Sequence, residues 1–366
     1  MNLANSTGVK VVAIGLQGGG SHSALAWGVL DELLEKVDQG RLNIAAISGA
    51  SGGALNGAVC AYGLRKSAKA AQELLRKFWM SVAEKSLWPP QNPWQSALPE
   101  SSPERWNVDL DPLAIAVGMA EQIVSPYCSP FGSHNVLRPL LAEAMPELEA
   151  FAAEDGKAPK LFVSATAVDR TALRIFGPAE ITIDALIASA CLPTFFEAVV
   201  IDGTPYWDGG YLANPALNPL LDYADDVLTI LIDPLCVNGG PPVTPRQIVN
   251  RINEVSFNAS WVLEMRQIEL INKLCKEGQL KDSKYKFKRL HLIANDTYME
   301  AIGATSKIVP SRDFLLALHE EGRKTARNWL DQNFNKIGKS SSLDVDARIS
   351  LRLKGSHEAM AAVRPP

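Results

Sequence analysis

Two segments near the start of the chain share one order: a short apolar run, a glycine-rich turn, and a stretch whose apolar residues have helical spacing. The first pairs a predicted strand at 10–16 with a predicted helix at 21–37, and the second pairs 43–48 with 52–62. Strands that lead through tight turns into helices are typical of parallel sheets, whose strands need crossover connections. The sequence therefore predicts an α/β protein with a mostly parallel central sheet.

Later segments continue this alternation. Residues 181–190 have a helical pattern with Thr182 in a position to cap the helix, and apolar residues recur at helical spacing from residue 246 onward. Three further apolar runs have the character of buried strands: residues 160–168, 225–233 and 287–295. No internal repeat is present.

The length of 366 residues and an apolar fraction of 47% allow one large core. We expect a single domain over residues 8–335, with the chemical motifs in residues 10–235 and a helical part in residues 246–335. Periodicity is lost near residue 336 and the chain ends in RPP, so residues 336–366 are predicted to form a mobile tail.

Charge and cysteine content exclude several classes. A net charge of −4 without a Lys/Arg block argues against a nucleic-acid partner. Five cysteines without a CxxC pair argue against a disulfide framework and a zinc site. The N-terminus lacks a signal-peptide pattern, and no run of 18 apolar residues occurs. We expect a cytoplasmic protein without a metal or other cofactor; its oligomeric state is left open.

Residues 87–106 interrupt this pattern with five prolines and three tryptophans. Proline in this density excludes regular secondary structure over most of the segment. The tryptophans could anchor a surface loop or a subunit contact, and they could also touch a lipid interface or line a lid.

The turn GASGG carries the first chemical signal. Gly49, Ser51 and Gly53 fit the pattern G-x-S-x-G between a predicted strand and a predicted helix, which is the context of a nucleophile elbow. Ser51 would lie at a helix N-terminus, where developing negative charge is favoured. The alternative is a serine that only caps the helix.

The earlier turn, QGGG, offers backbone donors for the same chemistry. Acyl transfer through a serine passes through an oxyanion, and the amides of Gly18, Gly19 and Gly20 could stabilise it. The alternative is a phosphate-binding loop, but the turn lacks the Lys-[Ser/Thr] ending of a P-loop and fits G-x-G-x-x-G poorly.

A serine nucleophile needs a base, and the histidines are weak candidates. His291 falls in a predicted strand and His319 in a predicted helix, His134 and His357 lie in no motif, and His22 is a candidate lining residue beside the glycine run. A Ser–His–Asp hydrolase using His291 or His319 is kept as an alternative.

Asp208 is the stronger candidate base. It follows a predicted hairpin turn at Asp202-Gly203, and Gly209 and Gly210 leave space beside its carboxylate. A carboxylate in a partly desolvated cleft has a raised pKa and can accept the serine proton directly. The alternative is an aspartate that caps a turn.

Together the three motifs, in this order, resemble the patatin-like phospholipase family. GGGSHSALAWGVL is similar to its oxyanion loop, GASGG to its nucleophile elbow and DGG to its aspartate motif; IASACLPTFFEAVVIDG also fits the family pattern. The resemblance covers roughly residues 10–235. It implies a three-layer α/β/α fold and metal-free hydrolysis of phospholipid, lysophospholipid or neutral glycerolipid esters, with Ser51 as nucleophile, Asp208 as base and Gly18 to Gly20 as oxyanion donors.

One position departs from the family pattern. The family often has Arg or Lys followed by Gly two residues after the third glycine, whereas this chain has His22 and Ser23. The departure weakens the expectation of a phospholipid over a simpler lipid ester, and His22 could replace the cation only when protonated.

These observations predict a cytoplasmic lipid acyl hydrolase, with a lipid or acyl-ester substrate and peripheral membrane contact. Two other functions stay open: a small-ester esterase, and a non-catalytic lipid-binding or interaction protein on the same fold.

Overall fold

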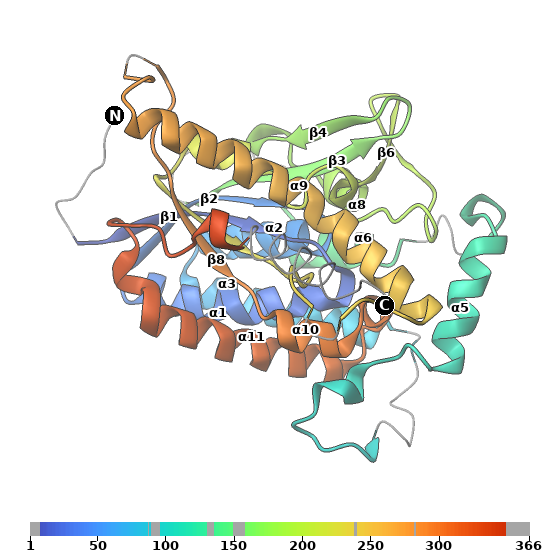
Figure 1. Cartoon of the computed structure of the whole chain (residues 1–366). Coiled ribbons are helices and arrows are strands. Elements are labelled where there is room, and N and C mark those ends of the chain that lie inside the picture. Colours follow the sequence, from blue (N-terminus) through green and yellow to red (C-terminus); the bar gives the residue numbers. More distant parts are fainter. Residues whose placement is uncertain are drawn as a thin grey trace, which may run out of the picture.

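The computed structural model describes residues 8–86, 88, 96–129, 135–148, 158–237, 240–281 and 283–348. Its centre is one eight-stranded sheet with helices on both faces (Figure 1). The strands are β1 (Lys10–Leu16), β2 (Leu42–Gly49), β3 (Lys160–Ala167), β4 (Ala172–Phe176), β5 (Val199–Ile201), β6 (Thr204–Asp208), β7 (Asp226–Ile230) and β8 (Arg289–Ile293).

The sheet is mixed and mostly parallel. Its strand order is β5-β6-β3-β2-β1-β7-β8, and β4 pairs with β3 outside this path. The pairs β1–β2, β1–β7, β7–β8 and β2–β3 are parallel, whereas β3–β4, β3–β6 and β5–β6 are antiparallel. The predicted α/β class with a mostly parallel sheet is confirmed.

Two apolar cores lie on opposite faces of this sheet. Successive strand side chains point to opposite faces, so Val12 and Ile14 join the core under one helical layer while Ala13 packs in a second core with Trp261 of α9. The α-helices are α1 (Ser23–Asp38), α2 (Gly52–Leu64), α3 (Ala68–Glu84), α5 (Pro112–Ile123), α6 (Leu137–Ala144), α8 (Ile183–Ser189), α9 (Pro245–Lys276), α10 (Asp296–Ile302) and α11 (Arg312–Asn333).

Several local predictions are confirmed. The predicted strand at 10–16 is β1, and the predicted helix at 181–190 is α8, whose Ala185 amide donates 3.1 Å to the Thr182 hydroxyl. The hairpin between β5 and β6 turns at Asp202 and Gly203, both with positive φ. The helical pattern after residue 246 is the 32-residue helix α9, which is followed by β8.

The proline- and tryptophan-rich segment is only partly described. Residues 87 and 89–95 lie outside the described residues. Trp88 packs against the main core, and Trp106 is buried beside Phe314, with ring centroids 5.3 Å apart. These two tryptophans therefore anchor their part of the excursion to the core; a lid or lipid contact by the segment stays a prediction.

The chain after residue 335 differs from the expected mobile tail where it is described. Ile337 and Val345 are buried, and the Gly338 amide donates 2.9 Å to Asp226 of β7. Residues 336–348 are thus held to the sheet by the buried Ile337 and Val345 and by backbone hydrogen bonds from Ser342 and Leu343 to Leu290 of β8. Residues 349–366 lie outside the described residues.

Candidate active site

The three predicted motifs meet at one edge of the sheet. β1 and β2 run in parallel with Leu16 opposite Gly49, so the loops that follow both strands leave the sheet side by side. β6 runs antiparallel to β3 with Asp208 opposite Ala165, which brings the aspartate to the same region. Ligand sites in open α/β sheets form at the carboxyl ends of parallel strands.

Ser51 has the backbone of a strained elbow. Its φ of 52° and ψ of −131° are rare for a residue with a side chain, and such conformations cost on the order of 1–3 kcal/mol. Its amide donates to the carbonyl and the hydroxyl of Ser189, at 3.2 and 3.0 Å, immediately before α2 begins. A serine that only capped the helix would not need this strained backbone, and the Ser51 side chain makes no capping hydrogen bond within the described residues.

Neighbouring glycines make this turn sterically feasible. A Cβ at Gly53 would collide with the Leu16 carbonyl, and a Cβ at Gly49 would lie 2.6 Å from the Gly53 carbonyl oxygen. Gly49 and Gly53 therefore allow the backbones of β1, β2 and α2 to approach closely around Ser51.

The Asp208 carboxylate is fully buried. Burial raises its pKa to about 6, while the Ser51 hydroxyl, the Gly210 amide and the charge of Lys307 act in the opposite direction. Oδ1 accepts a hydrogen bond of 2.7 Å from the Gly210 amide, whereas Oδ2 is buried and receives no hydrogen bond of ordinary length and angle from the described residues. The Ser51 hydroxyl is thus close enough to the Asp208 carboxylate to lower its pKa.

The glycines that follow Asp208 have different surroundings. A Cβ at Gly209 would collide with the Ser164 carbonyl, and a Cβ at Gly210 would lie 2.6 Å from the Phe257 ring. Gly209 therefore lets β6 leave the sheet beside β3, and Gly210 both contacts α9 and donates to the catalytic candidate. Neither position would accept a side chain without displacing its neighbours.

The glycine run after β1 is not uniform. The Gly18 amide donates 2.8 Å to the Asn214 side chain, so this donor is already bound, and a Cβ at Gly18 would lie 2.6 Å from the Ser51 Cβ. Neither the Gly19 nor the Gly20 amide hydrogen-bonds another described residue. Gly18 thus lies against Ser51 with its amide already bound, and the amides of Gly19 and Gly20 stay candidates for binding an oxyanion.

Asn214 is a site residue that the sequence did not single out. It belongs to the Asn-Pro segment after Asp208, and its side chain holds the Gly18 amide in place. Residues 214 and 215 read Asn-Pro in the sequence, but nothing in the sequence indicates that Asn214 binds the Gly18 amide, 196 residues away.

His22 is buried and does not supply a positive charge. Burial and the nearby charge of Lys307 hold its pKa well below its ordinary value of 6.5. Its Nε2 shares a hydrogen bond of 2.7 Å with the Ser306 hydroxyl. The suggestion that protonated His22 replaces the missing cation is therefore unsupported, because a buried imidazole beside a lysine stays neutral.

Lys307 is the cation that the sequence did not reveal. It lies in the short 3-10 helix η7 (Ala304–Ile308), and its Nζ pairs with Asp233 at 2.6 Å and with Asn253 at 2.8 Å. Its charge lowers the pKa of both Asp208 and His22. The sequence offers one indication of this ion pair: Asp233 ends the apolar run that contains β7, at the carboxyl ends of the parallel strands.

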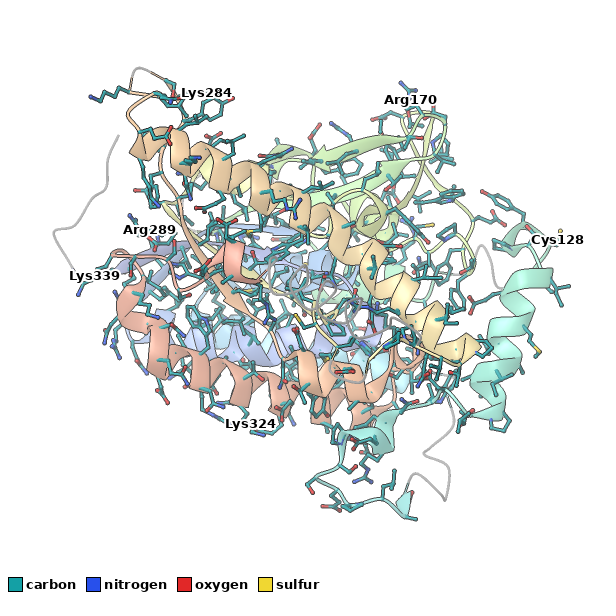
Figure 2. The ribbon with its side chains drawn as sticks, in the orientation of Figure 1. Cys128, Arg170, Lys284, Arg289, Lys324 and Lys339 are labelled. Atoms are coloured by element: carbon teal, nitrogen blue, oxygen red, sulfur yellow. The ribbon has the colours of Figure 1, made fainter. Side chains whose placement is uncertain are left out.

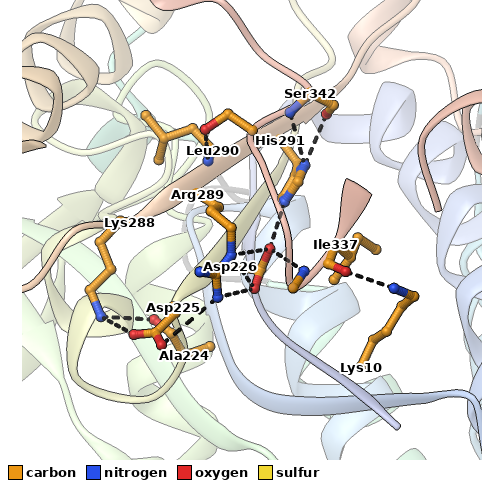
Figure 3. A network of polar contacts seen from close by, with 12 residues as sticks. Lys10, Ala224, Asp225, Asp226, Lys288, Arg289, Leu290, His291, Ile337 and Ser342 are labelled. Carbon is orange, nitrogen blue, oxygen red and sulfur yellow. Dashed lines mark hydrogen bonds and ion pairs between the residues drawn. The ribbon is translucent and has the colours of Figure 1, made fainter. Parts of the chain in front are cut away.

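The two histidines kept as alternative bases are bound elsewhere. His291 of β8 shares hydrogen bonds of 2.9 Å with Asp226 and with Ser342 (Figure 3). His319 of α11 shares one of 2.7 Å with Asp31. Within the described residues, no hydrogen bond joins a histidine to Ser51. His134 and His357 lie outside the described residues.

No metal site is seen in the described part of the chain, where no three His, Cys, Asp or Glu side chains gather suitably. A cavity of about 860 Å³ opens between α10 and α11 and is lined by residues such as Tyr298 and Trp329. Ser51 and Asp208 do not line it, so it is separate from the candidate active site.

Fold and site together give an α/β protein with a strained serine at a strand-to-helix turn and an adjacent buried carboxylate. The chain belongs to the patatin-like phospholipase family, whose sequence model, "Patatin-like phospholipase", matches residues 15–221, more than half of the chain. Members of this family are typically serine hydrolases. The family resemblance predicted from the motifs is confirmed.

Similar solved structures are bacterial proteins. VipD from Legionella pneumophila is 13% identical with a TM-score of 0.41, and the match covers 88% of this chain and 67% of that one. ExoU in complex with SpcU, from the type III secretion system of Pseudomonas aeruginosa, is 16% identical with a TM-score of 0.30, and ExoU itself is 14% identical with a TM-score of 0.31.

The match to the ExoU–SpcU structure covers 71% of this chain and the match to ExoU covers 87%, but the chain spans only 52% and 53% of those two chains. None of the curated proteins matches the chain significantly. In the described residues, every helix is too short or too polar to cross a membrane.

Proposed function

We propose that the protein is a lipid acyl hydrolase in which Ser51 is the nucleophile and Asp208 the general base. The observation that carries the proposal is the position of the strained Ser51, whose hydroxyl lies beside the buried Asp208 carboxylate and lowers its pKa. A carboxylate with a pKa near 6 is ionised at neutral pH and still basic enough to assist proton removal. Neither a metal nor a cofactor takes part.

Proton and acyl transfer follow from this pairing. Ser51 Oγ attacks the ester carbonyl carbon as its proton moves to Asp208, and the tetrahedral intermediate forms. Asp208 returns the proton to the departing alcohol, which leaves an acyl-serine. Water then attacks the acyl-serine as Asp208 takes a proton from it, and collapse of the second intermediate returns that proton to Ser51 and releases the acid.

The oxyanion would be held by backbone amides. Among the described residues, no hydrogen bond engages the Gly19 or Gly20 amide. Gly52 follows the nucleophile at the start of α2, the position that supplies a donor in other elbow-type hydrolases. Gly18 is assigned to spacing the loop, since its amide is bound to Asn214. Loss of one such donor typically costs about 2.7–4 kcal/mol in the transition state.

The substrate class rests on the family, whose name implies a phospholipid or related lipid ester. Among the described residues, Lys307 is the cation whose charge lowers the pKa of Asp208, and it is paired with Asp233. The site therefore offers little free positive charge to a phosphate headgroup. A lysophospholipid or neutral glycerolipid ester is equally compatible, and a small ester is the simplest alternative.

The test is covalent labelling with a fluorophosphonate probe, followed by intact mass and peptide mapping. Wild type is compared with Ser51→Gly, Asp208→Asn and the exposed-site control Ser256→Ala. Glycine is chosen because it removes the nucleophile and also accepts the positive φ, so this variant should stay folded and be at least as stable as wild type.

One adduct on the Ser51 peptide, absent from Ser51→Gly and retained in Ser256→Ala, is the expected result. Ester turnover should fall with it in Ser51→Gly and Asp208→Asn. Labelling of another serine, or turnover retained in Ser51→Gly, would contradict the proposed pair. Well-folded protein that takes no label but binds lipid would instead point to the non-catalytic alternative.

A further inference from the structure

Exposed apolar side chains gather on two segments of the molecule. Twelve of the twenty large hydrophobic side chains exposed in the described part of the chain lie in residues 110–127 and 243–255. On α5, Met119 is 61% exposed and Ile123 is 82% exposed; on α9, Ile252 is 61% exposed. Such concentration differs from the scattered single hydrophobics that any protein surface carries.

The outer faces of both segments also lack charge. Among the described side chains of residues 112–128 and 243–259, none of the exposed ones is charged, although the whole protein has 21% charged residues. The charged residues of α9 in this range, Arg246, Arg251 and Glu254, are partly or fully buried. Charged groups are thus turned inward, whereas the exposed side chains are uncharged and mostly apolar, which reverses the usual arrangement of a surface helix.

The two segments are neighbours, and their exposed side chains are together named here the α5–α9 surface. Asp109, just before α5, accepts hydrogen bonds of 3.1 and 3.0 Å from Asn250 of α9, and Arg246 lies 3.8 Å from the same carboxylate. Figure 1 shows α5 beside the N-terminal end of α9. Cys128, which follows α5, lies at the outer margin of this region (Figure 2).

The α5–α9 surface adjoins the candidate active site. On the inner side of α9, the Phe257 ring packs against Gly210 and Asn253 accepts a hydrogen bond from Lys307. After the C-terminal end of α5, the Tyr127 hydroxyl accepts a hydrogen bond of 3.0 Å from the Ala198 amide. Ala198 lies in the segment between Cys191 and β5. One helix therefore contacts the Asp208 motif on one side and carries apolar side chains on the other.

We propose that the α5–α9 surface binds a lipid bilayer or aggregate and holds the active site against it. Hydrocarbon fits because the outward side chains can leave water without desolvating a charge. The same face adjoins the Asp208 motif, as a surface that delivers lipid would need to do. Its role in delivering substrate rests on the proposed hydrolase function, whereas lipid binding itself does not.

Vesicle flotation tests binding without requiring turnover. The full-length protein is mixed with phosphatidylcholine vesicles, and wild type is compared with Met119→Lys/Ile123→Lys/Ile252→Lys. The matched control is Leu263→Lys/Leu270→Lys, which places lysines at positions 61% and 58% exposed on the other half of the same helix. Turnover of a short-chain water-soluble ester and solution mass are measured for all three proteins.

We expect the triple variant to lose at least tenfold in its partition onto vesicles, while the control stays within twofold of wild type and soluble-ester turnover is unchanged in both. No flotation of wild type, or equal flotation of all three proteins, would overturn the inference. So would a wild-type dimer that the triple variant converts to monomer, since a second copy would then cover the surface. Absence of ester turnover with flotation retained would count against the proposed function alone.

Discussion

The buried Asp208 carboxylate carries a cost that the fold must tolerate. Its pKa rises from 3.8 to about 6, and two units correspond to roughly 3 kcal/mol of unfavourable charge burial. Because the folded state binds the proton more tightly, this cost is absent below pH 4, where the carboxyl is protonated in both states. It is fully present above pH 6.

Asp208→Asn should therefore inactivate the protein and also stabilise it at pH 8, by up to about 3 kcal/mol, since the amide oxygen can still accept from Gly210. The gain over wild type should shrink as the pH falls towards 4. Urea unfolding of both proteins at several pH values measures this difference. A stability difference that does not change with pH would show that Asp208 titrates normally.

Lys307 should set the pH at which the base becomes active. Asp208 faces Ser51 and Gly210 at hydrogen-bonding range, Cys191 and Tyr211 as further titratable groups, and the charge of Lys307. Since that charge lowers the pKa of Asp208, Lys307→Met should move the acid limb of the kcat/KM profile to higher pH.

Lys307→Arg keeps the positive charge and is the matched variant, so its acid limb should stay close to that of wild type. Lys307→Met also leaves Asp233 unpaired, and a stability measurement separates that effect from the pH profile. If both substitutions lowered activity equally without moving the acid limb, the lysine would act only on structure.

At the scale of elements, α1 and α11 cross at a close backbone contact. A Cβ at Gly322 of α11 would collide with the Leu25 carbonyl, and a Cβ at Gly28 of α1 would collide with the His319 carbonyl. The crossing is also joined by His319 to Asp31 at 2.7 Å and Arg323 to Glu32 at 2.7 Å. These two glycines therefore set the distance between the helices.

Gly322→Ala should destabilise the protein by about 1–3 kcal/mol or more, because the helices must separate to admit one methyl group. Gly118→Ala is the control: this helical glycine has no neighbour nearer than 3.4 Å to an added Cβ, so the change should be neutral or stabilising by up to about 1 kcal/mol. Thermal unfolding compares the two. Equal shifts in Tm would contradict the close-contact explanation.

Elements and motifs could be predicted where the determining pattern is local. β1, α8 and the hairpin at Asp202 each depend on residues that are neighbours in sequence, and the elbow at Ser51 has its own signature. The environment of Lys307 could not be predicted, because its partners come from other elements. The hydrogen bond from the Gly18 amide to Asn214 could not be predicted for the same reason, because the two residues lie far apart in the sequence.

For the whole molecule, the C-terminal segment closes the outer edge of the sheet. Burial raises the pKa of Asp226, but hydrogen bonds from His291, Arg289 and the Gly338 amide outweigh burial and hold it below its ordinary value (Figure 3). Residue 338 belongs to this segment, so the network joins β7, β8 and the chain beyond α11.

A chain that ends at residue 335 should lose this closure. It lacks the Gly338 and Ser342 contacts and the burial of Ile337 and Val345, and each buried side chain contributes on the order of 1.5–3 kcal/mol. A chain that ends at residue 348 keeps all of these and is the control. Urea unfolding should show a loss of several kcal/mol only for the shorter chain, and equal midpoints would show that the segment is dispensable.

The position of β7 has a consequence for any attempt to shorten or transplant this protein. The family-matched stretch, residues 15–221, contains both Ser51 and Asp208, yet β7 (Asp226–Ile230) lies beyond it and pairs directly with β1. A fragment cut at that boundary would expose an interior strand as an open edge and would lose Asp233 and Lys307. Genetic fusions and swaps should therefore respect the sheet, because the homologous stretch alone is not a module that can be moved.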